Sequence, residues 1–140
     1  MERNIAVLIG GVIGGAVKLV VDQLAFASGI SSVDTIGTVS NLLFVQSGMG
    51  WFIYVIVTGF AGWLAARLIS QEYLVSYFSS GLILGIVLWA LMNIFFIVSG
   101  IATPTWSMGI GSFVINLFSH LVLGIVIVYT ISRTKIDIIR

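Results

Sequence analysis

Cysteine is absent from this 140-residue chain, which excludes disulfide bonds, thiol chemistry and cysteine-ligated metal sites. Charge is also scarce: 8% of the residues are charged, against about 25% in soluble domains. So few charges cannot cover a water-facing surface, and the net charge of +1 gives no basis for binding nucleic acid. Hydrophobic residues make up 59% of the chain, with a mean hydropathy of +1.20. The composition therefore predicts an integral membrane protein in contact with the lipid bilayer.

Four apolar stretches are each long enough to cross roughly 30 Å of hydrocarbon at about 1.5 Å per residue. They are Ile5–Ala27, Trp51–Ile69, Ser80–Ser99 and Ser112–Ile131. Runs such as residues 82–88 are continuously apolar, whereas the strands of a membrane barrel alternate apolar and polar residues. We therefore expect an all-α fold in which one domain, residues 1–140, forms a bundle of four transmembrane helices.

The basic residues predict how these helices are oriented. The first and third loops contain no Lys or Arg, and the basic residues that flank the helices all lie at the opposite end. Those residues are Arg3, Arg67, Arg133, Lys135 and Arg140. Because cytoplasmic loops are enriched in Lys and Arg, both termini are predicted to be cytoplasmic. The predicted location is the bacterial inner membrane, with a multi-pass topology.

Two of the loops have unusual compositions. Residues 28–50 are too apolar for a solvated loop, so a short interfacial helix or a re-entrant segment is expected there, with Asp34 or Ser32 as its N-cap. In the third loop, Gly100 and Pro104 are expected to end the preceding helix. Trp106 suits the outer headgroup boundary.

Lys18 and Asp22 lie within the first apolar stretch. Each costs roughly 2.5–3.5 kcal/mol in hydrocarbon, even on the lenient insertion scale. Their spacing places them on one helical face, where they continue a stripe of small residues, Gly11 and Gly15. The later stretches contain similar stripes: Gly59, Gly62 and Ala66; Gly81, Gly85, Trp89 and Asn93; and Ser112, Asn116, His120 and Gly124. The polar residues are therefore expected to face the bundle interior.

Depth along the helices brings these polar residues to a common level. Lys18 and Asn93 are both predicted about 20 Å above the cytoplasmic end, and His120 about 12 Å below the outer end. We therefore predict one cluster in the outer half of the membrane, as a candidate ligand-binding or ion-binding site. It comprises Lys18, Asp22, Asn93, Asn116 and His120.

Two interpretations of this cluster remain open. In the first, Lys18 neutralises Asp22 and the other side chains form hydrogen bonds between helices, so the cluster is structural. In the second, it lines an outward-opening cavity for an ion, a proton or a small solute, because His120 titrates near neutral pH. An enzyme is not expected, because a single His without a recognisable nucleophile provides too few groups for a catalytic site. No metal site or cofactor is expected either.

The second half of the chain carries three short motifs that resemble a known family. They are Ser80-Gly81-Leu82-Ile83-Leu84-Gly85, Gly100-Ile101-Ala102-Thr103-Pro104 and His120-Leu121-Val122. This pattern resembles the YagU-type bacterial inner-membrane proteins and the related YqhR-like proteins, a family of unknown function. YagU-type proteins carry a Glu where Asn116 stands here. The resemblance implies a small polytopic membrane protein and names no activity.

The sequence as a whole favours a structural or accessory membrane subunit that forms a homo-oligomer or joins a larger membrane complex. The small-residue stripes and minimal loops are the basis for this interpretation. The alternative is a small channel or transporter that uses Lys18, Asp22 and His120 to pass an ion, a proton or a small solute.

Overall fold

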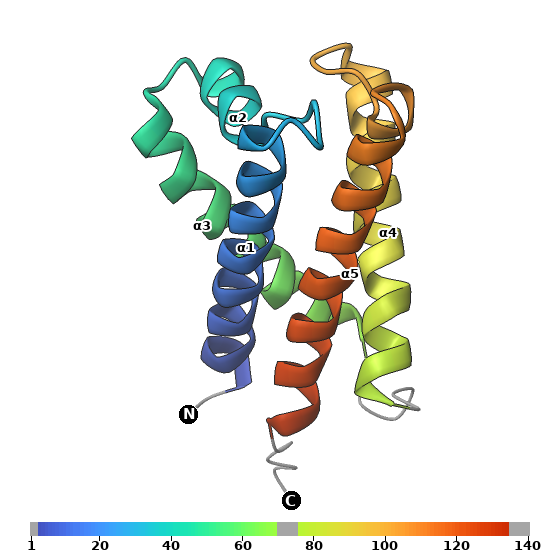
Figure 1. Cartoon of the computed structure of the whole chain (residues 1–140). Coiled ribbons are helices and arrows are strands. Elements are labelled where there is room, and N and C mark those ends of the chain that lie inside the picture. Colours follow the sequence, from blue (N-terminus) through green and yellow to red (C-terminus); the bar gives the residue numbers. More distant parts are fainter. Residues whose placement is uncertain (1–2, 70–75, 135–140) are drawn as a thin grey trace, which may run out of the picture.

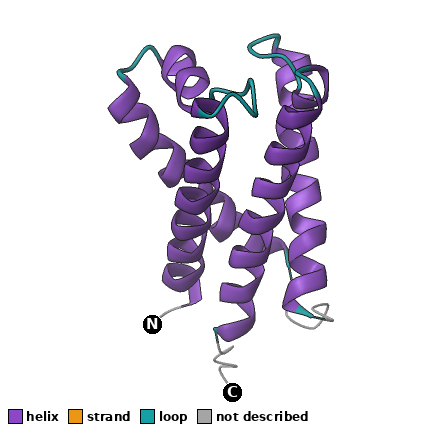
Figure 2. Cartoon of the chain, viewed as in Figure 1, coloured by secondary structure: helices purple, strands orange, loops and turns teal. Residues whose placement is uncertain are grey.

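A computed structural model describes residues 3–69 and 76–134 of the chain (Figure 1). All of its regular elements are helices, and no strand occurs in these two ranges (Figure 2). The elements are α1 (Arg3–Ala27), α2 (Thr35–Leu43), α3 (Ser47–Leu68), α4 (Tyr77–Ser99), the short 3-10 helix η2 (Thr105–Ser107) and α5 (Ile110–Arg133).

Four of these helices, α1, α3, α4 and α5, are long and apolar enough to cross a membrane. The predicted all-α fold with four transmembrane helices is therefore confirmed, and the chain is a multi-pass membrane protein. The helices extend beyond the predicted apolar stretches: α3 begins at Ser47 rather than Trp51, and α4 at Tyr77 rather than Ser80. Polar capping explains the earlier start of α4, because Ser76 Oγ accepts a hydrogen bond of 3.2 Å from the Ser79 amide.

The apolar first loop contains the predicted short helix, α2. Asp34 is its N-cap, and the Asp34 carboxylate accepts a 2.8 Å hydrogen bond from the Gly37 amide. The helix ends at Phe44, which has a left-handed backbone conformation (φ 54°) and a side chain that is 97% exposed. An exposed phenylalanine at this position agrees with an interfacial segment, because exposing an aromatic ring to lipid is favourable and exposing it to water is not.

The four long helices pack in the order α3, α1, α5, α4, and their contacts depend on glycine. Gly11 of α1 lies against the backbone of Thr58 and Gly59 on α3. Gly124 of α5 lies against the backbone of Gly81 and Gly85 on α4. The small-residue stripes predicted from the sequence therefore lie at helix–helix contacts, as expected where helices associate through close approach in lipid.

The ends of this row, α3 and α4, share no extensive contact. In Figure 1, α3 passes behind α1 and its first turns lie far from α4 at the end of the bundle that carries α2. The two helices therefore diverge toward the end where the first and third loops lie.

The start of α1 and the end of α5 lie on the same side of the bundle (Figure 1). Arg67 and Arg133, in the last turns of α3 and α5, lie at that same end. Lys135, Arg140 and the polar loop residues Gln71 and Glu72, by contrast, lie outside the described residues. Cytoplasmic termini therefore stay a prediction from the charge asymmetry.

Because the chain has no cysteine, single cysteines can test this orientation. Ser107 and Ser132 are exposed and lie at opposite ends of the bundle. In intact spheroplasts, a membrane-impermeant maleimide should label Ser107→Cys, whereas Ser132→Cys should react only after permeabilisation. The reverse labelling pattern would place the termini outside. The unsubstituted protein is the background control.

Candidate functional site

Lys18 and Asp22 form a buried ion pair on the inward face of α1. Lys18 Nζ lies 2.5 Å from Asp22 Oδ2, and both side chains are 1% exposed. Lys18 Nζ also lies 5.6 Å from the centroid of the Tyr54 ring on α3, within the range of a cation–π interaction. The two charges are therefore neutralised inside the protein, with no contact to lipid.

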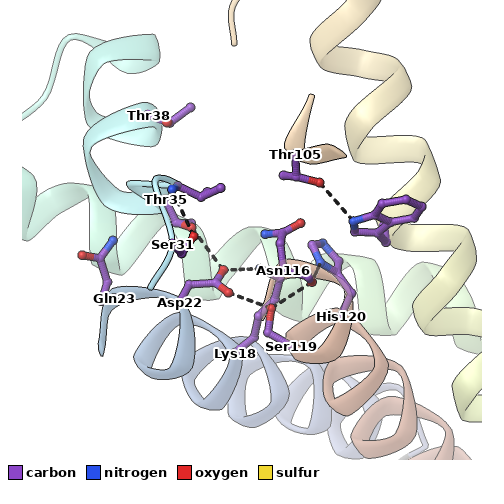
Figure 3. A network of polar contacts seen from close by, with 12 residues as sticks. Lys18, Asp22, Gln23, Ser31, Thr35, Thr38, Thr105, Asn116, Ser119 and His120 are labelled. Carbon is purple, nitrogen blue, oxygen red and sulfur yellow. Dashed lines mark hydrogen bonds and ion pairs between the residues drawn. The ribbon is translucent and has the colours of Figure 1, made fainter. Parts of the chain in front are cut away.

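Both oxygens of Asp22 have further partners on other elements (Figure 3). Ser119 Oγ on α5 donates to Asp22 Oδ1 at 2.7 Å, and Thr35 Oγ1 at the start of α2 donates to Oδ2 at 3.1 Å. Asp22 thus ties α1 to α5 and to the loop helix. The sequence prediction missed Ser119 and Thr35, because a lone hydroxyl in an apolar stretch gives little signal before its neighbours are known.

Asn93 belongs to a separate group that fixes the third loop. Its Oδ1 accepts from the Thr105 amide at 2.6 Å and from Thr105 Oγ1 at 3.0 Å, and its Nδ2 donates to the Trp89 carbonyl at 2.8 Å. Trp89 Nε1 in turn donates to Thr105 Oγ1 at 3.2 Å. These bonds hold η2 against α4. Asn93 therefore satisfies the loop backbone, and both acceptor positions of its Oδ1 are used within the protein.

Asn116 and His120 lie one turn apart on α5. His120 Nδ1 lies 2.7 Å from the Asn116 carbonyl, so this nitrogen carries the proton and donates. The Asn116 side chain is different, because it is buried (2% exposed) and its Oδ1 has no hydrogen-bond partner. An unpaired buried amide oxygen is uncommon and calls for an explanation.

A cavity of about 460 Å³ lies in the opening between α3 and α4, beneath α2 and the third loop. Its walls are mainly apolar and include Ile53 and Val57 of α3 and Met92 and Phe96 of α4. Asn116 lines it, whereas Lys18, Asp22 and His120 are not among the described residues around it. The Asn116 side chain therefore borders the cavity, and the charged pair is set apart from it.

The structure thus divides the predicted cluster into two groups. Lys18 and Asp22 are joined to Asn116 and His120 through Ser119, whose Oγ lies within hydrogen-bond distance of both Asp22 Oδ1 and the Asn116 carbonyl (Figure 3). Asn93 forms a separate group with the third loop. All five predicted residues are buried. In residues 3–69 and 76–134, no three His, Cys, Asp or Glu side chains converge to hold a metal ion. Both groups join segments of the chain, and of the five predicted residues Asn116 is the one that lines the cavity and has a buried, unpaired side-chain oxygen.

No family model, curated protein or solved structure matches this chain. The resemblance to the YagU-type and YqhR-like proteins therefore stays a prediction. The geometry of the buried polar groups is the basis for a functional assignment.

Proposed function

We propose that this protein is a structural or accessory subunit of a bacterial cytoplasmic membrane, and that it does not conduct ions. One observation carries the proposal: the Lys18–Asp22 pair is closed on all sides by groups of the protein itself. Asp22 accepts from Lys18, Thr35 and Ser119, and its side chain is 1% exposed. A transport site requires charges that can meet a solute, whereas these charges contact each other, two hydroxyl groups and the Tyr54 ring.

The remaining intramembrane polar groups support the same assignment. Ser112 Oγ of α5 accepts from the Ser32 amide at 2.8 Å, and Asn93 holds the Thr105 amide. Each bond links a loop on the outer side to a long helix. Since lipid cannot satisfy these backbone groups, buried side chains that do so stabilise the outer loops. The polar residues therefore serve the architecture of the bundle.

An accessory role also needs a surface for another subunit, and α4 provides the best candidate. In the 18-residue apolar stretch of this helix, only 17% of the residues are buried, compared with 44% in the corresponding stretches of α1 and α5. Ile83 on this helix is 64% exposed. A second copy of the chain or a larger membrane complex would cover this face, where van der Waals contact between helices drives association.

Reconstitution tests the proposal directly. Purified protein in liposomes should give proton, potassium and chloride fluxes equal to those of empty liposomes. A flux above that background that is abolished by Asp22→Asn or His120→Ala, in variants that still fold, would overturn the proposal in favour of a channel or transporter.

A photo-crosslinking residue placed at Ile83 tests the accessory role in the native membrane. It should give a discrete adduct with a protein subunit, either a second copy or another chain. The same residue at Ile13 on α1, which is 53% exposed, is the comparison position. Adducts with lipid alone at Ile83 would contradict an accessory role.

A further inference from the structure

The cavity between α3 and α4 has a lateral mouth toward the membrane. The two helices that flank it share no extensive contact. Val57 and Phe95 line it, yet they are 58% and 51% exposed, so they stand at its open edge. Since α3 and α4 are membrane spans, this edge faces lipid and not water. A molecule dissolved in the bilayer can therefore enter between the two helices.

The walls of the cavity determine the chemistry of its occupant. Most of the lining is apolar, from Ile53, Met92 and Phe96 among others. The volume of about 460 Å³ falls within the roughly 300–1,000 Å³ usual for small-molecule sites. Among the described lining residues none is Lys, Arg or His, and Asp34 contributes a carboxylate. An anionic head would meet that carboxylate without a compensating cation, so the occupant is not an anion.

Asn116 supplies the polar contact. It is 2% exposed, lines the cavity, and its Oδ1 has no hydrogen-bond partner. Figure 3 shows its amide between Thr35 on one side and Thr105 on the other. The hydroxyls of both threonines already donate, to Asp22 and to Asn93, so they do not supply a donor to this amide. A hydroxyl is the head that suits an amide best, because it pairs with either the oxygen or the nitrogen.

We propose that this cavity binds a neutral, hydroxyl-bearing, single-chain amphiphile from the outer leaflet, with its hydroxyl on Asn116 and its chain between α3 and α4. Asn116 lies six residues into α5, about 9 Å below the start of that helix. That depth places the hydroxyl just beneath the headgroups, and the chain then lies in hydrocarbon. This site is independent of the proposed accessory function and stands if that function fails.

Photoaffinity labelling of the full chain in phosphatidylcholine nanodiscs tests the site. The probes are a diazirine-bearing hexadecanol and the fatty acid with the same chain and diazirine position. The alcohol should label peptides of α3 and α4 about threefold to tenfold more than the acid, which corresponds to one added hydrogen bond. Excess unlabelled monoacylglycerol should compete this labelling away in the unsubstituted protein.

One matched pair of variants and one substitution of Asn116 locate the labelling. Val57→Trp, which fills the cavity, should reduce alcohol labelling to the level seen with competitor. Ile56→Trp is the matched control, because Ile56 is 51% exposed on the same turn and does not line the cavity. Asn116→Leu should lower alcohol labelling to the level of the acid. Because the competition experiment uses the unsubstituted protein, the test does not depend on the folding of any variant.

Three outcomes would overturn the proposal. Equal labelling by the alcohol and the acid would show that Asn116 does not select a hydroxyl head. Labels spread over the exposed faces of α1 and α5 would indicate ordinary lipid contact. Equal effects of Val57→Trp and Ile56→Trp would show that the cavity is not where the chain lies.

Discussion

Replacing Lys18 with methionine is expected to destabilise the protein by about 3–5 kcal/mol, because it leaves the Asp22 carboxylate without its countercharge in a buried site. Ser119 and Thr35 still donate to Asp22, but two neutral donors do not replace a cation. The free energy of unfolding in mixed detergent micelles, followed by helical circular dichroism, measures the loss.

The double substitution Lys18→Met with Asp22→Leu should recover most of this loss. Replacing a buried ion pair by apolar groups of similar volume is often neutral or stabilising, because neither charge then needs to be desolvated. Ser119 retains an acceptor in the Asn116 carbonyl at 3.0 Å, whereas the Thr35 hydroxyl loses Asp22 as its acceptor. A residual cost of about 1 kcal/mol is therefore expected.

Arg67→Met is the matched control for removing one positive charge. Arg67 is exposed and stacks over Trp63 at 4.8 Å from the ring centroid, so its loss should cost under about 1 kcal/mol. A double variant as unstable as Lys18→Met alone would contradict the structural role. Removing both charges would then not restore stability, so the loss could not be explained by an uncompensated Asp22 charge.

Gly124→Ala is expected to cost about 3 kcal/mol, the upper part of the usual range for overpacking. A methyl group at Gly124 would meet the Gly81 carbonyl and the Gly85 amide closer than atoms approach in real structures. Both obstacles are backbone, so the only relief is to move α5 away from α4. The higher helix propensity of alanine, worth about 1 kcal/mol, does not offset this separation.

Gly48→Ala provides the control for the glycine substitution. Gly48 is also within a membrane-span helix, and a methyl group there would have no neighbour within 4 Å. Its unfolding free energy should be unchanged or slightly raised. If Gly124→Ala were equally tolerated in the same detergent unfolding experiment, the close α4–α5 contact would be contradicted.

The sequence allowed the membrane spans and the packing faces to be predicted. Hydrophobic length identifies a span because only a helix satisfies its own backbone in lipid, and this holds without tertiary information. Gly11 and Gly124 were expected at helix contacts, and they lie there, because close approach requires a missing side chain. Asp34 or Ser32 was expected to cap the loop helix, and the hydrogen bond from the Gly37 amide shows that Asp34 does so.

The partners of the polar residues were not predictable in the same way. Depth along the helices suggested a single cluster. In the structure, however, Asn93 accepts a hydrogen bond from the Thr105 amide, whereas Asp22 accepts one from Ser119. Depth is one coordinate, and the order of the helices around the bundle supplies the others. That order, with α3 and α4 at its two ends, was not available from the spacing of residues.

The sequence by itself determined a membrane protein of four helices with buried polar residues, because hydropathy and helical periodicity act locally along the chain. Only the tertiary structure decided that Lys18 and Asp22 are enclosed while Asn116 faces a cavity open toward lipid. The physical reason is that a buried charge is stable only with partners, and those partners come from helices far apart in sequence whose arrangement is set by packing.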